Sequence, residues 1–179
     1  MAAPIISKNI RVRHPEHFAI GPFSIVDDFC YFSTRVTVGE CSHIASGCSV
    51  AGGERYQFSM GSYSSLSSGV KVWCGSDDFI NDVIAIIPPG VTDVKEHFIG
   101  GDVKLGDMTG VGANSVIMPD NEIPEGTVIG ALSYVPPRFP FEPWSVYAGI
   151  RVRLVGRRNR DSVMRQVEKL KAQLDLLRK

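Results

Sequence analysis

The sequence has no run of eighteen or more apolar residues, and this excludes a membrane-spanning helix of ordinary length. The first fifteen residues contain no apolar stretch long enough for a secretory signal. Zinc-finger spacings and aromatic RNA-binding signatures are also absent. Hydrophobic residues at 44% and charged residues at 21% are ordinary values for a globular domain. We therefore expect a cytoplasmic protein whose 179 residues build one main domain.

Cysteine is scarce, and its spacing is uninformative for metals or disulfides. Cys30, Cys41, Cys48 and Cys74 form no C-x-x-C pair and do not combine with histidine at zinc-site spacing. In a chain without a secretory signal we expect free thiols that pack as small hydrophobic residues. The sequence therefore predicts no metal.

The formal net charge is zero, but its distribution is uneven. Residues 138–179 hold 11 Lys and Arg against 4 Asp and Glu, and the remainder of the chain is correspondingly acidic. A basic segment of this kind binds nucleic acid, an anionic membrane or a phosphorylated ligand. Since no nucleic-acid module accompanies it, the charge pattern favours a phosphate-rich small molecule.

Apolar residues recur with a period of six. This period fits neither a helix nor an ordinary hairpin sheet, but it is typical of a solenoid in which each hexapeptide contributes one strand and one corner. The sequence therefore predicts a left-handed parallel β-helix, with one large anchor of each hexapeptide pointing inward. The sixteen anchors are Ile20, Val26, Phe32, Val38, Ile44, Val50, Met60, Leu66, Val72, Ile99, Leu105, Val111, Ile117, Ile123, Ile129 and Val135.

Two further columns follow the same register. Small residues such as Ser24, Ser42 and Ser115 stand four places after an anchor, where they let the corner close. Glycine directly follows several anchors, and we expect it where the chain turns tightly or takes positive φ. The glycines concerned are Gly21, Gly39, Gly61, Gly100, Gly106, Gly112 and Gly130.

The period is interrupted twice. Four extra residues bulge near Gly52–Arg55, and the repeat vanishes for some twenty residues across Asp78–His97. Long loops in compact domains are commonly functional, and a protruding loop supplies the concavity that a flat solenoid lacks. We expect a β-helix domain over residues 1–158 with a loop at 78–98, followed by a C-terminal helix at 159–179. The helix is expected to pack on the solenoid or on the same helix of a neighbouring subunit.

Three motifs resemble the hexapeptide-repeat acyltransferases, and among them the sugar acetyltransferases of lipopolysaccharide, O-antigen and capsule biosynthesis. They are Val111–Pro119, Val128–Ser133 and Trp144–Gly149, the last at the place of the family's Tyr-Ala-Gly motif. The resemblance implies a homotrimer with acetyl-CoA in the groove between neighbouring prisms. It also implies a nucleotide-sugar or saccharide acceptor and no metal.

The resemblance further implies which residues hold the cofactor. The pantetheine arm of acetyl-CoA would run along the main chain of the last coils, and basic residues after the repeat would meet the CoA phosphates. Arg151 stands where the family usually has proline, and Pro136-Pro137 where it often has Thr-Lys. The cofactor-binding candidates are Gly112, Ala113, Ala131, Pro136, Arg153 and Arg158.

Many relatives carry a catalytic histidine directly before the loop, where this sequence has Asp77. A histidine there deprotonates a sugar hydroxyl, whereas an aspartate, with an ordinary pKa of about 4, is a weaker base unless burial raises it. A neutral amine attacks a thioester with less help, so Asp77 favours an amino-sugar nucleotide as acceptor. Asp78 and His97 are further catalytic candidates. Candidate substrate-binding residues, flanking the aspartates or facing a neighbour, are Trp73, Phe79 and His43.

Three alternatives stay open at this point. In the first, Asp77 is an exposed corner residue and the chain is a non-catalytic scaffold or nucleotide-sugar binder. In the second, the acceptor atom is oxygen, as in an O-acetyltransferase. A metal-dependent hydratase of the γ-carbonic anhydrase type shares the prism, but it needs three histidines, and the repeat offers only His43 with His97 at its edge.

Overall fold

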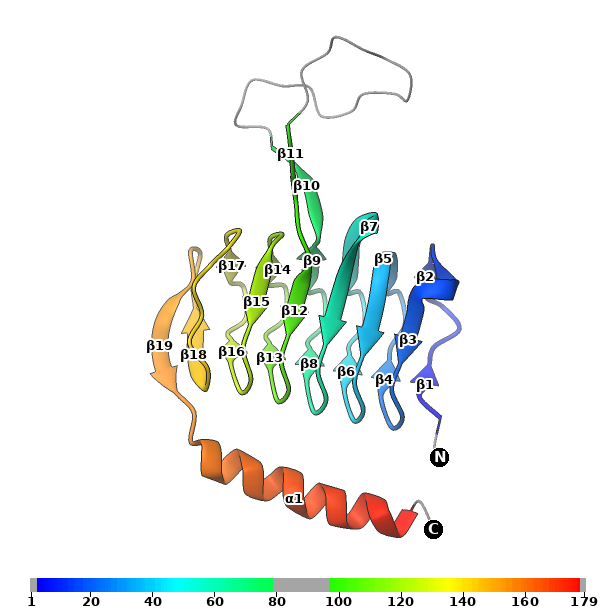
Figure 1. Ribbon diagram of the computed structural model, residues 1–179, viewed down its shortest axis with the longest axis vertical. Helices are drawn as coiled ribbons and strands as arrows, with labels where there is room; N and C mark the ends of the chain where they lie inside the picture. Colours follow the sequence, from blue (N-terminus) through cyan, green and yellow to red (C-terminus); the bar gives the residue numbers. More distant parts are fainter. Residues whose placement is uncertain (1–2, 79–96, 178–179) are drawn as a thin grey trace.

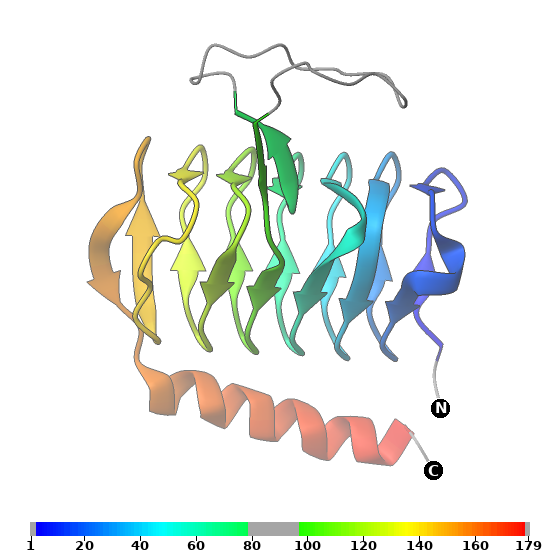
Figure 2. The same cartoon turned by 45° about the horizontal axis from the view of Figure 1, so that its top comes forward.

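The computed structural model describes residues 3–78 and 97–177, and here the chain folds as the predicted left-handed parallel β-helix. Short strands from successive coils stack side by side and build three faces of a prism (Figure 1). A hairpin leaves the prism near its middle, and a helix returns along one of its edges (Figure 2). The repeat therefore produces a nearly uniform rod, on which the interruptions supply the irregular features.

Each face collects one strand from every coil. The first face contains β1 (Ile5–Ile6), β4 (Ile25–Val26), β6 (His43–Ile44), β8 (Ser65–Leu66), β13 (Gly110–Val111), β16 (Val128–Ile129) and β18 (Ser145–Ala148). The second contains β2 (Arg11–Val12), the starts of β5 (Tyr31–Val38) and β7 (Ser49–Met60), β9 (Lys71–Trp73), β14 (Val116–Ile117) and β17 (Tyr134–Val135). The third contains β3 (Phe18–Ile20), the ends of β5 and β7, β12 (Val103–Leu105) and β15 (Asn121–Ile123).

Five elements depart from the parallel stack. A 3-10 turn, η1 (Pro15–His17), precedes β3, and β10 (Gly75–Asp77) pairs antiparallel with β11 (Phe98–Gly100). The strand β19 (Arg153–Arg157) runs antiparallel to β18. The helix α1 (Arg160–Leu177) ends the chain. These elements cover or extend the prism rather than continue its coils.

The predicted anchors form the core. All are buried except Ile20, which is half-buried, and Ile99, which is not part of a coil. Ile99 lies in β11 opposite Ser76, because the chain leaves the prism after Cys74 and rejoins the stack only at β12. The assignment of Ile99 and Gly100 to the repeat was therefore wrong, and the register resumes at Leu105.

The glycines after the anchors are required by coil spacing rather than by φ. A Cβ on Gly61 would lie 2.6 Å from the Asp107 backbone nitrogen in the next coil, and Gly39 would meet Ser62 at the same distance. Buried serines then bridge the coils, since Ser42 Oγ donates to the Gly61 carbonyl at 2.9 Å. Glycine and serine columns thus act together to hold neighbouring coils about 4.8 Å apart.

The residue with positive φ stands three places after the anchor, and it is mostly not glycine. Tyr63 has φ 58°, Met108 56° and Asn114 57°. A left-handed backbone costs a residue with a Cβ about 1 kcal/mol or more. Of the two expected reasons for these glycines, positive φ does not apply, because coil closure imposes the left-handed turn two residues later in each hexapeptide.

The helix α1 packs on the solenoid of its own chain. Val167 and Leu174 are buried, and the Lys171 ammonium lies 5.7 Å from the centre of the Tyr63 ring. The ribbon places α1 along the edge between the third and first faces (Figures 1 and 2). Of the two predicted packing partners, the structure shows the solenoid. The division into domains at residues 158 and 159 stays a prediction.

The four cysteines are free thiols, as predicted. Cys30, Cys48 and Cys74 are buried in the core, and burial raises the pKa of the Cys74 thiol to about 12. That thiol is therefore protonated at neutral pH and packs as a small hydrophobic group. Among the described residues, no helix is both long enough and apolar enough to cross a bilayer.

Candidate active site

The hairpin β10–β11 is rooted in the middle of the prism. The Cys74 backbone nitrogen donates to the Ala51 carbonyl at 2.6 Å, and the Gly101 nitrogen donates to the Cys74 carbonyl at 3.0 Å. The Phe98 ring stacks on Tyr56 with centroids 6.2 Å apart. These contacts hold the two strand ends that carry the predicted catalytic residues. Phe79 and the loop over 79–96 lie outside the described residues.

Asp78 and His97 meet where the hairpin opens. The Asp78 amide donates to the His97 carbonyl at 2.9 Å, and Asp78 Oδ2 lies 2.9 Å from His97 Nδ1. The Asp78 side chain is 10% exposed and that of His97 51% exposed. A carboxylate on Nδ1 selects the tautomer in which the proton of the neutral imidazole is on Nδ1 and the lone pair is on Nε2. The pair therefore has the arrangement of an oriented general base.

The pair lines a pocket of about 350 Å³. Its opposite side is formed by Pro137 and Arg138, which follow β17 on the second face. Arg138 Nε lies 2.6 Å from Asp120 Oδ2, so the guanidinium is held at the rim. The volume falls in the range of small-molecule sites, and the pocket combines a base, a cation and the apolar Phe98. Pro136, a predicted cofactor-binding residue, directly precedes Pro137 of this pocket.

Asp77 does not face His97. It lies in β10 opposite Phe98 and directly precedes Asp78. Because successive side chains of a strand point to opposite sides, the two carboxylates diverge. Asp77 is half-buried and is available to a ligand on the other side of the hairpin. The role of Asp77 as base stays a prediction. The carboxylate that pairs with His97 is that of Asp78.

The other two predicted substrate-binding residues lie apart from this pocket. Trp73 is half-buried at the end of β9, opposite Ala51. His43 stands on the first face, where its Nε2 lies 2.8 Å from Asp27 Oδ2. Within one chain, therefore, the structure does not bring His43 to the hairpin.

Most of the cofactor candidates share one edge, between the first and second faces. Gly112 and Ala113 follow β13, and Ala131 follows β16 one coil later. The Leu132 nitrogen donates to the Ala113 carbonyl at 2.9 Å, which stacks the two turns. A pocket of about 370 Å³ ends this edge, lined by Ala148, Gly149, Ile150, Arg151, Arg153 and Val155.

Arg158 lies on a different edge. Its Nη1 donates to the carbonyls of Met108 at 2.6 Å and Gly126 at 2.8 Å, and its guanidinium lies 6.0 Å from the centre of the Trp144 ring. Burial lowers the pKa of Arg158 from its usual value. In this structure the side chain joins the start of α1 to the solenoid, away from Ala113 and Ala131.

Comparison with known proteins identifies the family, although no family model matches the chain. An N-acyltransferase from Bacillus cereus, AntD, in complex with dTDP and 3-hydroxybutyryl-CoA, is 32% identical; the match covers 95% of this chain and 88% of AntD, with a TM-score of 0.84. The chain belongs to the hexapeptide-repeat acyltransferases. A curated Escherichia coli relative, dTDP-4-amino-4,6-dideoxy-D-glucose acyltransferase, is 26% identical over 150 residues, which are 81% of this chain and 74% of the relative.

More distant structures share the fold alone. A maltose O-acetyltransferase from Clostridium difficile is 21% identical over 80% of this chain and 72% of its own, with a TM-score of 0.60. Family membership makes this chain a CoA-dependent acyltransferase. It decides against the hydratase and the non-catalytic scaffold, both of which the sequence had left open.

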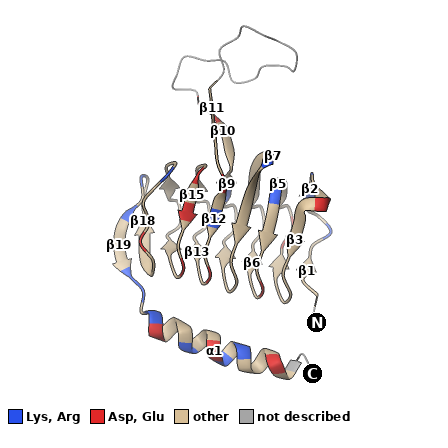
Figure 3. Cartoon of the chain, in the orientation of Figure 1, with Lys and Arg blue, Asp and Glu red and all other residues tan. Residues whose placement is uncertain are grey.

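The surface charge of this acyltransferase agrees with a phosphorylated co-substrate. Figure 3 shows basic residues on β19 and on the segment that leads from it to α1. Arg151 and Arg153 are exposed and line the pocket at the end of the edge that carries Ala131. Their guanidinium groups suit phosphate oxygens, which accept two parallel hydrogen bonds from one arginine.

Sequence reasoning missed part of this acyltransferase's pocket. Arg138 and Phe98 line it, but neither was singled out, since Arg138 lay within a proline-rich stretch and Phe98 within the assumed loop. A signal was present, because Arg138 falls three residues after the anchor Val135 and so stands on a corner turn. The proximity of that corner to His97 depends on how the coils stack.

Proposed function

We propose that this enzyme transfers an acyl group from acyl-CoA to the amino group of a dTDP-linked 4-amino-sugar. The observation that carries the proposal is the likeness to AntD over nearly the whole chain at 32% identity. A variant of AntD was solved with dTDP-4-amino-4,6-dideoxyglucose and coenzyme A, at 31% identity and a TM-score of 0.84. The E. coli relative, matched over most of this chain, carries the same sugar in its name.

The chemistry expected of such an acceptor agrees with the pair at the hairpin. The lone pair of the neutral amine attacks the thioester carbonyl carbon, the C–N bond forms and the C–S bond breaks. The CoA thiolate departs, and the proton lost by nitrogen passes to His97 Nε2 and then to the thiolate. Asp78, 2.9 Å from His97 Nδ1, stabilises the imidazolium that forms in between.

The remaining candidates take binding roles in this proposal. The turns at Gly112, Ala113 and Ala131 receive the pantetheine arm, and Arg153 meets a CoA phosphate. Asp77, on the other side of the hairpin, binds the acceptor away from the amine that His97 deprotonates. Arg138, at the rim of the pocket, meets the diphosphate.

We further propose that the enzyme is a homotrimer. In one chain the second face separates the edge of Ala113 and Ala131 from the hairpin, so each edge alone is half a site. Packing of the hairpin of one subunit near the CoA edge of a neighbour would join the two halves. His43, on the first face, would then also come near a neighbouring subunit. We place the reaction in cytoplasmic synthesis of a surface polysaccharide precursor.

The test is acyl transfer by the purified chain. Acetyl-CoA and 3-hydroxybutyryl-CoA are each offered with dTDP-4-amino-4,6-dideoxyglucose, CoA release is followed with a thiol reagent, and the product mass is measured. We expect an amide with at least one donor, acetyl-CoA being the donor predicted from the sequence. The matched acceptor dTDP-6-deoxyglucose, with a hydroxyl in place of the amine, tests the alternative. Acylation of dTDP-6-deoxyglucose at the same rate would replace the proposal by O-acyl transfer.

A further inference from the structure

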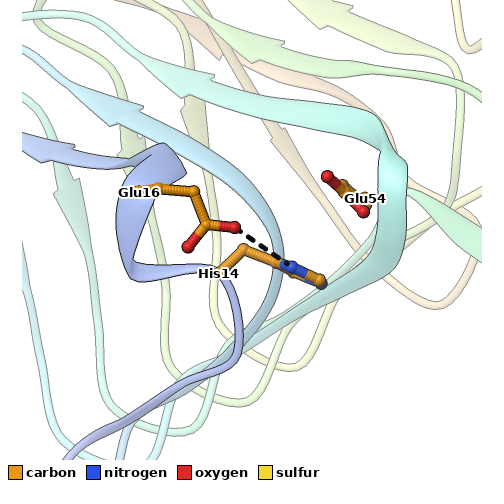
Figure 4. Close-up of side chains that lie close together, drawn as sticks. All are labelled: His14, Glu16 and Glu54. Carbon is orange, nitrogen blue, oxygen red and sulfur yellow. Dashed lines mark ion pairs between the residues drawn. The ribbon is translucent and has the colours of Figure 1, made fainter.

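A second cluster of titratable side chains lies on the N-terminal side of the hairpin. His14 directly precedes η1, Glu16 lies within η1, and Glu54 reaches the same place from β7 (Figure 4). His14 Nδ1 is 3.8 Å from Glu16 Oε1. One potential ligand atom from each of the three residues lies within 4.8 Å of the other two. Imidazole nitrogen and carboxylate oxygen thus converge at one point.

The cluster exists because β7 departs from the repeat. Four extra residues interrupt the period of six here, and the pairing of β5 with β7 shifts register between Phe32 and Arg35. Gly53, at φ 75°, turns the bulge, and the following residue, Glu54, extends toward η1. A regular hexapeptide would place no side chain there. The interruption is therefore what completes the cluster.

The charge balance of the cluster favours a cation. Among the described residues, the ion pairs of both carboxylates are with histidines: Glu16 with His14, and Glu54 Oε1 with His17 Nε2 at 3.6 Å. Two carboxylates that share a site repel each other, and a bound cation relieves that repulsion.

The neighbouring arginines do not supply that charge. The Arg13 guanidinium lies 5.9 Å from the centre of the Tyr31 ring, and that of Arg55 lies 5.5 Å from Tyr56. Arg35 lines an adjoining pocket with Glu16 and His17, but its Nη2 donates to the Arg55 carbonyl at 3.3 Å. Among the described residues, none of these three guanidinium groups forms an ion pair with either carboxylate.

We propose that His14, Glu16 and Glu54 bind a divalent transition-metal ion such as Zn²⁺. A mixed nitrogen and oxygen donor set suits Zn²⁺, whereas Ca²⁺ and Mg²⁺ prefer oxygen alone. Ligand atoms about 2.1 Å from zinc lie roughly 3.4 Å apart, so the cluster contracts by about 1 Å on binding. The side chains of Glu16 and Glu54 are exposed and can make this movement.

The ion has a structural role in this proposal. It joins the turn that enters the first coils to the bulge of β7, and so fastens the N-terminal end of the rod. The pocket of Asp78 and His97 includes none of the proposed ligands, so the ion takes no part in catalysis.

The test is metal binding by the full chain after treatment with EDTA. The partly exposed thiol of Cys41 is replaced first (Cys41→Ser), because a thiol binds zinc by itself. Titration calorimetry with ZnCl₂ is expected to give one ion per chain. Thermal unfolding is expected to shift upward by about 5 °C at a hundredfold excess over Kd.

Two variants and one control locate the ion. Glu54→Gln and His14→Gln are each expected to weaken zinc binding more than about tenfold, since even an outer-shell partner contributes that much. Glu168→Gln, an exposed change of the same kind on α1, is expected to bind as the parent does. The proposal is overturned if the parent binds no zinc, if both variants bind it unchanged, or if only His43→Gln abolishes binding.

Discussion

Replacement of Asp78 by asparagine is expected to lower turnover about 10- to 150-fold. The change keeps the size of the side chain but removes the negative charge 2.9 Å from His97 Nδ1, where the carboxylate is 10% exposed. A hydrogen bond to a charged group contributes about 1.5–3 kcal/mol. If that contribution is made in the transition state, each 1.36 kcal/mol corresponds to about tenfold in rate, and the stated range follows.

The assay is the initial rate of CoA release, with kcat and KM determined for both substrates. We expect kcat to fall with little change in the KM for acyl-CoA, because the CoA edge is separate from the hairpin. The kcat of His97→Gln is expected to fall at least as far as that of Asp78→Asn. The double variant should be no slower than His97→Gln alone, since the two residues act as one unit.

Two results would refute this reasoning. If Asp78→Asn keeps its rate within about twofold of the parent, the carboxylate does not stabilise a charge formed during the reaction. If the effects of the two changes multiply in the double variant, the residues act independently. Thermal unfolding of each variant separates loss of catalysis from loss of structure, because Asp78 also closes the hairpin through its backbone.

Three further changes test other parts of the molecule. Asp77→Asn is expected to lower turnover far more than acyl-CoA affinity, and near-normal turnover would remove Asp77 from the mechanism. Arg153→Ala is expected to weaken CoA binding about tenfold in calorimetry through loss of a charge-assisted phosphate contact, and unchanged affinity would contradict the assignment. Gly61→Ala is expected to lower the free energy of unfolding, measured by urea titration, by about 1–3 kcal/mol, because its Cβ would lie 2.6 Å from the Asp107 nitrogen. Gly110→Ala is the control in the same titration, since its Cβ would lie 3.6 Å from the nearest atom.

The fold could be predicted because its signal is local. An inward-facing residue every six places is visible in the sequence, and the buried anchors from Val26 to Val135 follow it. The prediction failed at Ile99, which has the right residue type at the right spacing but lies in a hairpin. The period of six predicts which side chains point inward, but this prediction holds only where the chain continues the coil.

The site could be predicted only in part. Asp78 and His97 were both singled out, at the two ends of the interruption, but their pairing was not foreseen. Arg158 was assigned to CoA from its place in the tail, and the structure directs it to the carbonyls of Met108 and Gly126. A basic residue in a tail has several possible partners, and the packing of α1 selects among them.

The sequence by itself determined the rod, its core and the places where the coil is broken, because burial of one side chain per hexapeptide is a property of neighbouring residues. The tertiary structure alone decided what meets on the outside of that rod. His97 approaches Asp78 because two strands pair across the break, and Glu54 approaches His14 because a bulge crosses to the preceding coils. Such contacts join residues distant in sequence, and their geometry depends on coil stacking and strand register, which no periodic pattern encodes.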